Sequence, residues 1–110
     1  MIVINKNEGL KIAHKVAGTK LTFGTDELTL NLARYQRDWP VLIDICSNKD
    51  NMLVIGAGAG LHYVAQIEIP AMEYTVPVTE EQTPEPKPID MSMVTLTLWS
   101  LVNPVPVTTI

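Results

Sequence analysis

The stretch Leu61-His62-Tyr63-Val64-Ala65-Gln66-Ile67-Glu68-Ile69 decides the fold class. Every second residue, from Leu61 to Ile69, is apolar or aromatic, and the residues between them are polar except Val64. Successive side chains of a β-strand point to opposite faces of a sheet, so this alternation predicts a strand with one buried face. The chain is therefore expected to fold mainly into β-strands.

The same period of two recurs upstream of this stretch. Residues 10–16 place Leu10, Ile12, His14 and Val16 on one face of a predicted half-buried strand. Further strands are predicted at residues 20–23, 28–32, 41–46 and 52–55, with a first hairpin near Gly24. A helix competes with a strand over residues 26–38, because Thr25 could cap it. We favour a strand, since only a strand collects Leu28, Leu30 and Leu32 on one side.

Downstream, the alternation continues through Met72, Tyr74, Val76 and Val78. Residues 80–90 are then acidic, proline-rich and nearly free of apolar side chains, which predicts a solvated linker or long loop. Residues 91–102 return to β-branched and apolar residues and predict a long final strand.

These elements predict an all-β fold, a small sandwich or barrel of about eight short, mainly antiparallel strands. We divide the chain into a β-domain body at residues 1–79, the linker at 80–90 and a C-terminal strand segment at 91–110. That segment is free of charge, and an exposed apolar strand pairs readily with other chains. We therefore expect it to pack on its own domain or on a neighbouring subunit, through Val94, Leu96, Leu98, Trp99 and Leu101.

The composition and charge of the chain argue against several classes of function. The chain has 110 residues, a net charge of −4 and one cysteine, as expected for one domain without a disulfide framework or a multi-cysteine metal site. Residues 1–50 carry seven basic and six acidic side chains, and residues 51–110 carry one basic and six acidic. This acidic balance argues against nucleic-acid binding. Because neither a secretory signal nor a membrane-spanning stretch is recognisable, we expect a cytoplasmic protein, or one built into a particle assembled there.

Two motifs suggest chemistry, and we interpret both structurally. Gly56-Ala57-Gly58-Ala59-Gly60 looks like the phosphate-binding turn of a dinucleotide-binding fold, but period two follows it and Leu61 stands where a small residue belongs. We interpret it as a glycine-rich hairpin or a pair of bulges. Cys46 could pair with His14 or His62, yet its position in an apolar strand favours a buried structural thiol. We predict no catalytic residue, metal or cofactor.

The best contact candidate is the segment containing Arg34, Tyr35, Arg37 and Trp39, because guanidinium and aromatic groups are enriched at binding hot spots. We expect a non-enzymatic structural or interaction protein that self-associates through β-strands, with another protein partner as a further option. Small assembly proteins of this build occur among virion and prophage components, although no motif establishes that identity. The alternative is a small-ligand or carbohydrate-binding β-domain that uses these four residues.

Overall fold

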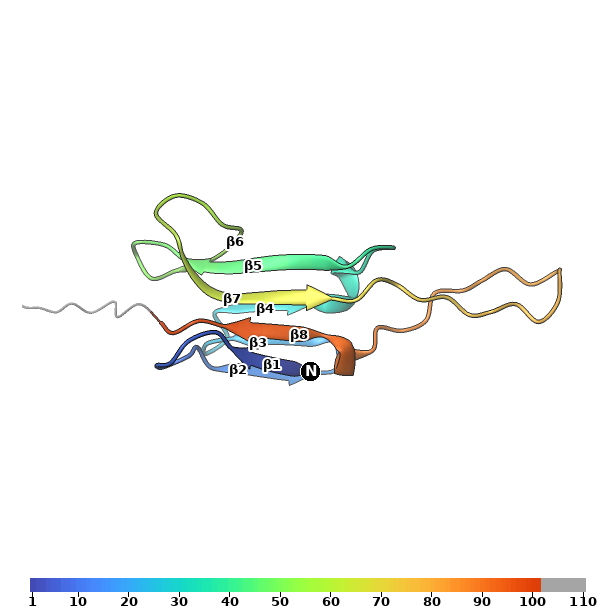
Figure 1. Ribbon diagram of the computed structural model, residues 1–110, viewed down its shortest axis with the longest axis horizontal. Helices are drawn as coiled ribbons and strands as arrows, with labels where there is room; N and C mark the ends of the chain where they lie inside the picture. Colours follow the sequence, from blue (N-terminus) through green and yellow to red (C-terminus); the bar gives the residue numbers. More distant parts are fainter. Residues whose placement is uncertain (102–110) are drawn as a thin grey trace, which may run out of the picture.

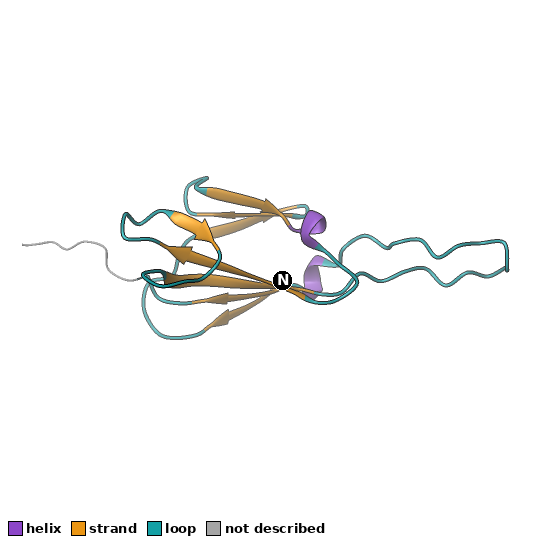
Figure 2. Cartoon of the chain, turned by 90° about the horizontal axis from the view of Figure 1, so that it is seen from above, coloured by secondary structure: helices purple, strands orange, loops and turns teal. Residues whose placement is uncertain are grey.

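The computed structural model describes residues 1–101 and confirms the all-β fold. Eight strands form two sheets that face each other as a sandwich, visible as two layers in Figure 2. The strands are β1 (Ile2–Asn5), β2 (His14–Ala17), β3 (Lys20–Phe23), β4 (Leu28–Asn31), β5 (Val41–Ser47), β6 (Leu53–Ile55), β7 (His62–Ile69) and β8 (Thr95–Leu98). Two 3₁₀-helices, η1 (Leu32–Tyr35) and η2 (Met91–Met93), lie at the same end of the sandwich.

The larger sheet has the order β1-β8-β7-β5-β6, and the smaller one has the order β2-β3-β4. All the pairings are antiparallel except that of β1 with β8, which is parallel. β1 and β2 are the end strands of their sheets, and both run along the lower border of the sandwich in Figure 1, one in each layer. We call this side, residues 1–20, the β1/β2 border.

The core is apolar and comes from both sheets. β7 lies at the centre of the larger sheet, where Ile67 is opposite Ile43 of β5 and Leu96 of β8. All three side chains are buried, as are Leu21 and Phe23 on the smaller sheet. The alternation in β7 thus buries one face of its sheet, as the sequence predicts.

Val64, which interrupts that alternation, is the extra residue of a β-bulge. Ile45 of β5 is opposite Ala65, whereas the next residue, Cys46, is opposite Tyr63. Val64 has no pairing partner on β5 and is buried, as is its neighbour Ala65. The bulge turns Tyr63 outward, where its ring stacks against Trp99 at a centroid distance of 4.9 Å.

Several local expectations are corrected. The predicted strand at residues 10–16 begins only at His14, and Leu10 is 77% exposed because the chain crosses there from one sheet to the other. Residues 28–31 are a strand, as preferred, but a 3₁₀-helix follows in which the side chain of Asn31 accepts from the N–H of Ala33. Residues 56–60 are not a hairpin, since β5 lies between β6 and β7. The predicted long final strand is only the four residues of β8.

Candidate functional site

The most distinctive feature of the molecule is an arm, residues 70–88, that leaves the sandwich after β7 and returns before η2 (Figure 1). Its two sides run antiparallel and are joined by backbone hydrogen bonds from Thr75 to Glu85 and from Lys87 to Glu73, each 2.8 Å long. Tyr74 and Pro86 form an isolated β-bridge between them. The predicted linker is therefore the tip and returning side of this arm.

The arm does not form a regular hairpin, and its prolines explain why. Pro77 stands on the outgoing side, and Pro84, Pro86 and Pro88 stand on the returning side. Proline has no N–H to donate to a strand ladder. The alternation over residues 72–78 consequently yields one bridge instead of the expected strand.

The root of the arm is attached to the loop that follows η1. The buried side chain of Gln36 donates to the carbonyl of Pro70 at 3.2 Å, and the N–H of Met72 donates to the carbonyl of Arg37 at 2.7 Å. The phenol of Tyr74 donates to the carboxylate of Asp38, and this hydrogen bond raises the pKa of the phenol. These contacts fix the direction in which the arm leaves the body.

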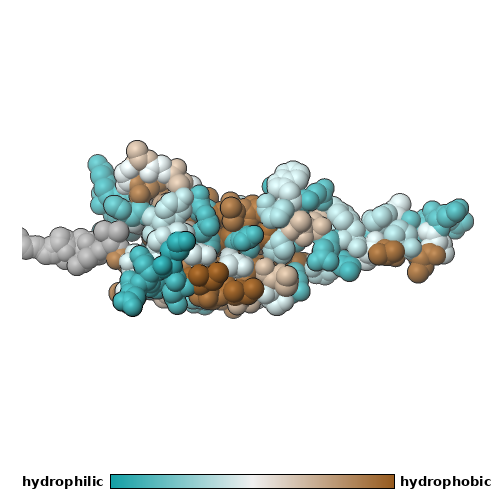
Figure 3. All heavy atoms as spheres, in the orientation of Figure 1, coloured by the Kyte–Doolittle hydropathy of each residue, from teal (hydrophilic) through white to brown (hydrophobic). Residues whose placement is uncertain are grey.

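Beyond its root, the arm presents apolar side chains to solvent. Val76 is 86% exposed and Val78 is 85% exposed, and Figure 3 shows apolar surface on this otherwise polar projection. Neither valine belongs to the core. Both face water at an energetic cost unless a second surface covers them.

A second apolar surface lies on the β1/β2 border. Ile2, Val3 and Ile4 of β1 are between 43% and 49% exposed, and Val16 of β2 is 44% exposed. Figure 3 shows an apolar patch along the lower side of the body, where Figure 1 places these strands. No charged residue or proline lies within β1, so this edge lacks the usual protection against pairing with another strand.

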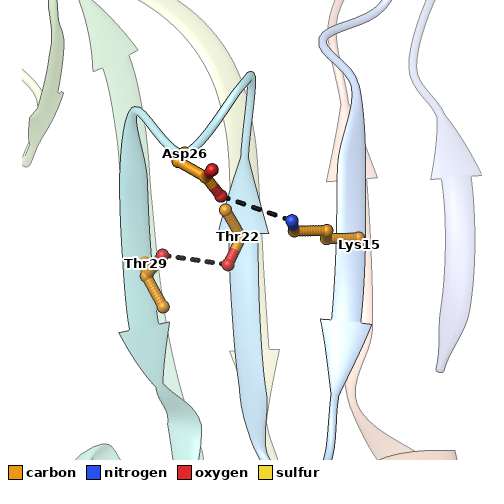
Figure 4. A network of polar contacts seen from close by, with 4 residues as sticks. All are labelled: Lys15, Thr22, Asp26 and Thr29. Carbon is orange, nitrogen blue, oxygen red and sulfur yellow. Dashed lines mark hydrogen bonds and ion pairs between the residues drawn. The ribbon is translucent and has the colours of Figure 1, made fainter.

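Polar contacts on the outer face of the smaller sheet lie next to this border. Thr22 of β3 and Thr29 of β4 share a hydrogen bond of 2.9 Å between their hydroxyls, and Lys15 of β2 forms an ion pair with Asp26 at 3.3 Å (Figure 4). The ion pair is largely exposed and contributes little to stability. The carboxylate and ammonium groups therefore remain accessible to other partners.

The predicted contact residues Arg34, Tyr35, Arg37 and Trp39 lie at the root of the arm. Tyr35 is half-buried against the core, whereas the other three are exposed, Trp39 by 62%. Arg37 donates to the carbonyls of Arg34 and Gln36, which holds the loop together. A neighbouring surface hollow of about 330 Å³ is lined by other residues: Gln36, Pro70, Ala71, Glu73, Lys87, Pro88 and Asp90.

The predicted oligomer contacts occupy two environments. Val94, Leu96 and Leu98 are buried inside the fold of the single chain, in or next to β8. Trp99 is half-buried on Tyr63, and Leu101 is packed partly against the core. The remainder of the predicted segment, residues 102–110, lies outside the described residues. In the described part of the segment, the predicted contact side chains are thus covered wholly or partly by their own chain.

The thiol and imidazole groups do not form a cluster. Cys46 is buried, and this burial, followed by the negative charge of Asp44, raises its pKa, the opposite of the shift that activates a nucleophilic cysteine. His62 is exposed at the start of β7, and His14 lies in the other sheet. Within residues 1–101, no group of three or more His, Cys, Asp or Glu side chains is placed to hold a metal ion.

Comparison of the chain with protein-family models, with curated proteins and with solved structures finds no match. Among residues 1–101, no helix has the length and apolar character needed to cross a membrane.

Proposed function

We propose that this protein is a non-enzymatic assembly protein that self-associates through β-strands, and that the arm is the element by which one copy holds another. The observation that carries the proposal is the exposure of Val76 and Val78 on a projection outside the core. A soluble domain gains nothing within its own fold from such side chains. Covering each valine at an interface contributes on the order of 1.5 kcal/mol.

The backbone of the arm supports the same function. Between its two sides only the region around Tyr74 and Pro86 is bridged, so backbone groups such as the N–H and C=O of Val76 are free to pair elsewhere; the prolines have no N–H, and the N–H of Val78 donates to the side chain of Gln82. An extended segment that adds to an exposed sheet edge obtains affinity from main-chain hydrogen bonds and specificity from alternate side chains. The arm offers both, through its open backbone and its two valines.

The root contacts make the arm suitable for this role. An interaction segment that is already directed loses less conformational entropy on binding than a free linker does. Gln36 and Asp38 hold the first residues of the arm from the side of the body. The Arg34–Trp39 segment, predicted as a contact surface, thus also supports the element proposed here to make contact.

The test is the solution mass of the full chain and of a shortened-arm variant in which Asn-Gly replaces residues 75–85. Tyr74 and Pro86 lie opposite each other in an isolated β-bridge, so two residues can span the gap between them, without a closing hydrogen bond because Pro86 has no N–H. Sedimentation over a range of concentrations should give species larger than the 12.1 kDa monomer for the full chain and a monomer for the variant. Circular dichroism checks that both are folded. A full chain that stays monomeric, or a variant that associates equally well, overturns the proposal.

A further inference from the structure

The charge of the chain is concentrated on the arm and the turn after it. Residues 70–90 carry five acidic side chains, Glu73, Glu80, Glu81, Glu85 and Asp90, and one basic side chain, Lys87. The net charge of this segment, −4, equals that of the whole chain, so the rest of the protein is neutral in sum. An acidic, partly apolar projection requires a receiving surface that is basic and partly apolar.

The β1/β2 border has this character. Residues 1–20 contain four lysines and a single acidic residue, Glu8, and Asp26 lies beside Lys15 in an exposed ion pair. The lysines flank the border strands: Lys6 follows β1, Lys11 precedes β2, Lys15 lies within β2 and Lys20 begins β3 opposite Ala17. In the sequence, the exposed apolar residues of β1 precede Lys6, and the exposed Val16 of β2 directly follows Lys15.

The border also offers an unpaired strand edge. The N–H of Ile2 donates to Val94 and that of Lys6 donates to Leu98, so alternate residues of β1 bond to β8. The residues between them, such as Val3, turn their backbone groups away from the sheet. Within residues 1–101, no strand covers that side of β1.

We propose that the arm of one copy docks along the β1/β2 border of a second copy, with Val76 and Val78 on the apolar residues and the glutamates beside the lysines. This inference rests on the proposed self-association and names the surface that receives the arm. It predicts a contact between two different surfaces, since the arm and the border are separate parts of each chain.

Charge reversal on the full-length protein tests the pairing. A border variant, Lys6→Glu with Lys15→Glu, and an arm variant, Glu80→Lys with Glu81→Lys, each place like charges on both partners. Either variant alone should associate at least about tenfold more weakly than the unchanged protein at low salt. An equimolar mixture should recover association, because each arm then meets a border of opposite charge.

The controls separate this pairing from general effects. All four substituted residues are exposed, so circular dichroism should show an unchanged fold. Lys49→Glu makes the same charge change as Lys6→Glu but lies in the turn between β5 and β6, and it should leave association unchanged. Replacing Val76 and Val78 together by serine should weaken association without altering its dependence on the lysines.

The outcomes distinguish the two proposals. If the unchanged protein is monomeric at every concentration, self-association itself is wrong. If it associates but neither charge variant weakens it, or the mixture associates no better than its components, the arm does not dock on this border and only the self-association proposal stands. Recovery in the mixture is the result that supports the pairing.

Discussion

The body of the protein should fold independently of its arm, and the shortened-arm variant allows this to be measured. The change replaces residues 75–85 by Asn-Gly and keeps Tyr74, with its hydrogen bond to Asp38, and Pro86. No residue of the removed segment belongs to the core. The change in the free energy of unfolding should therefore have two contributions: the shorter loop stabilises the variant by costing less entropy, and the loss of exposed hydrogen bonds destabilises it.

The two contributions nearly cancel. Closing a loop of two residues in place of eleven costs about 1.5 kcal/mol less entropy by the logarithmic length dependence. The variant loses four exposed hydrogen bonds: two between Thr75 and Glu85, one from each backbone N–H, and two within the tip, from the N–H of Val78 to the side chain of Gln82 and from the N–H of Gln82 to Thr79. At about 0.5 kcal/mol each, the lower end of the usual range, they sum to about 2 kcal/mol. The free energy of unfolding should consequently change by no more than about 1.5 kcal/mol.

Urea unfolding followed by circular dichroism measures this difference at a concentration where the full chain is monomeric. The dependence on urea should also be nearly unchanged, since little buried surface is removed. A loss of more than about 3 kcal/mol would refute the reasoning, because it would mean that the arm belongs to the folding unit. The control is Thr79→Ser at the tip of the arm, which should behave as the full chain does.

Two further predictions concern the body. Ile67→Ala in the centre of β7 should lower the free energy of unfolding by about 2–5 kcal/mol, because Ile67 is buried. Glu68→Ala, at the exposed neighbouring residue, should change it by about 0.5 kcal/mol or less. Urea unfolding measures both, and similar values for the two variants would contradict the assigned faces of β7. Burial raises the pKa of the Cys46 thiol, so the native state keeps its proton where the unfolded state releases it, and stability should fall as pH rises above about 8.5. Cys46→Ala should reduce this alkaline slope in unfolding experiments between pH 7 and 10, and an identical slope in both proteins would oppose the assignment.

The alternation of residues predicted the sandwich because burial of one face is a local property of sequence. The strands β3, β5 and β7 lie where the pattern places them. The turn at Gly24 joins β3 to β4 as predicted, but it closes the second hairpin and not the first, which joins β2 to β3 through Gly18. Even Val64, the exception to the pattern, marks a real feature, since the bulge sits at that residue. The alternation thus indicated the strand, and its one irregular position indicated the β-bulge.

Strand order and the arm could not be predicted in the same way. The separation of β6 from β7 by β5 depends on which edges meet in space, and period two says nothing about that. β1 was missed because Ile2-Val3-Ile4 is too short to show an alternation. The arm was divided into a strand and a linker because its outgoing and returning sides differ in composition, although hydrogen bonds join them.

The predicted contact residues have different surroundings in the structure for a related reason. Aromatic and guanidinium groups identified the Arg34–Trp39 segment, but the sequence does not show that this segment holds the arm through Gln36 and Asp38. The apolar side chains of the C-terminal segment suggested an interface, yet Leu96 and Leu98 complete the core of their own chain. Apolar character in the sequence predicts burial and leaves the identity of the covering chain open, whereas exposure in the folded chain, as at Val76, is the observation on which the proposed contact rests.

The geometry of the proposed contact restricts the assemblies that it can build. Each copy has one arm to give and one border to receive, so two copies satisfy both surfaces only if they exchange arms about a twofold axis. Without that axis, successive copies form a closed ring or an open filament. In a dimer or a ring every acidic arm lies on a lysine-rich border, and in a filament every arm but the one at its end does, which lowers the repulsion that a net charge of −4 imposes between copies. Raising the salt concentration should therefore weaken assembly through the arm. The body, whose charges sum to zero, should stay folded.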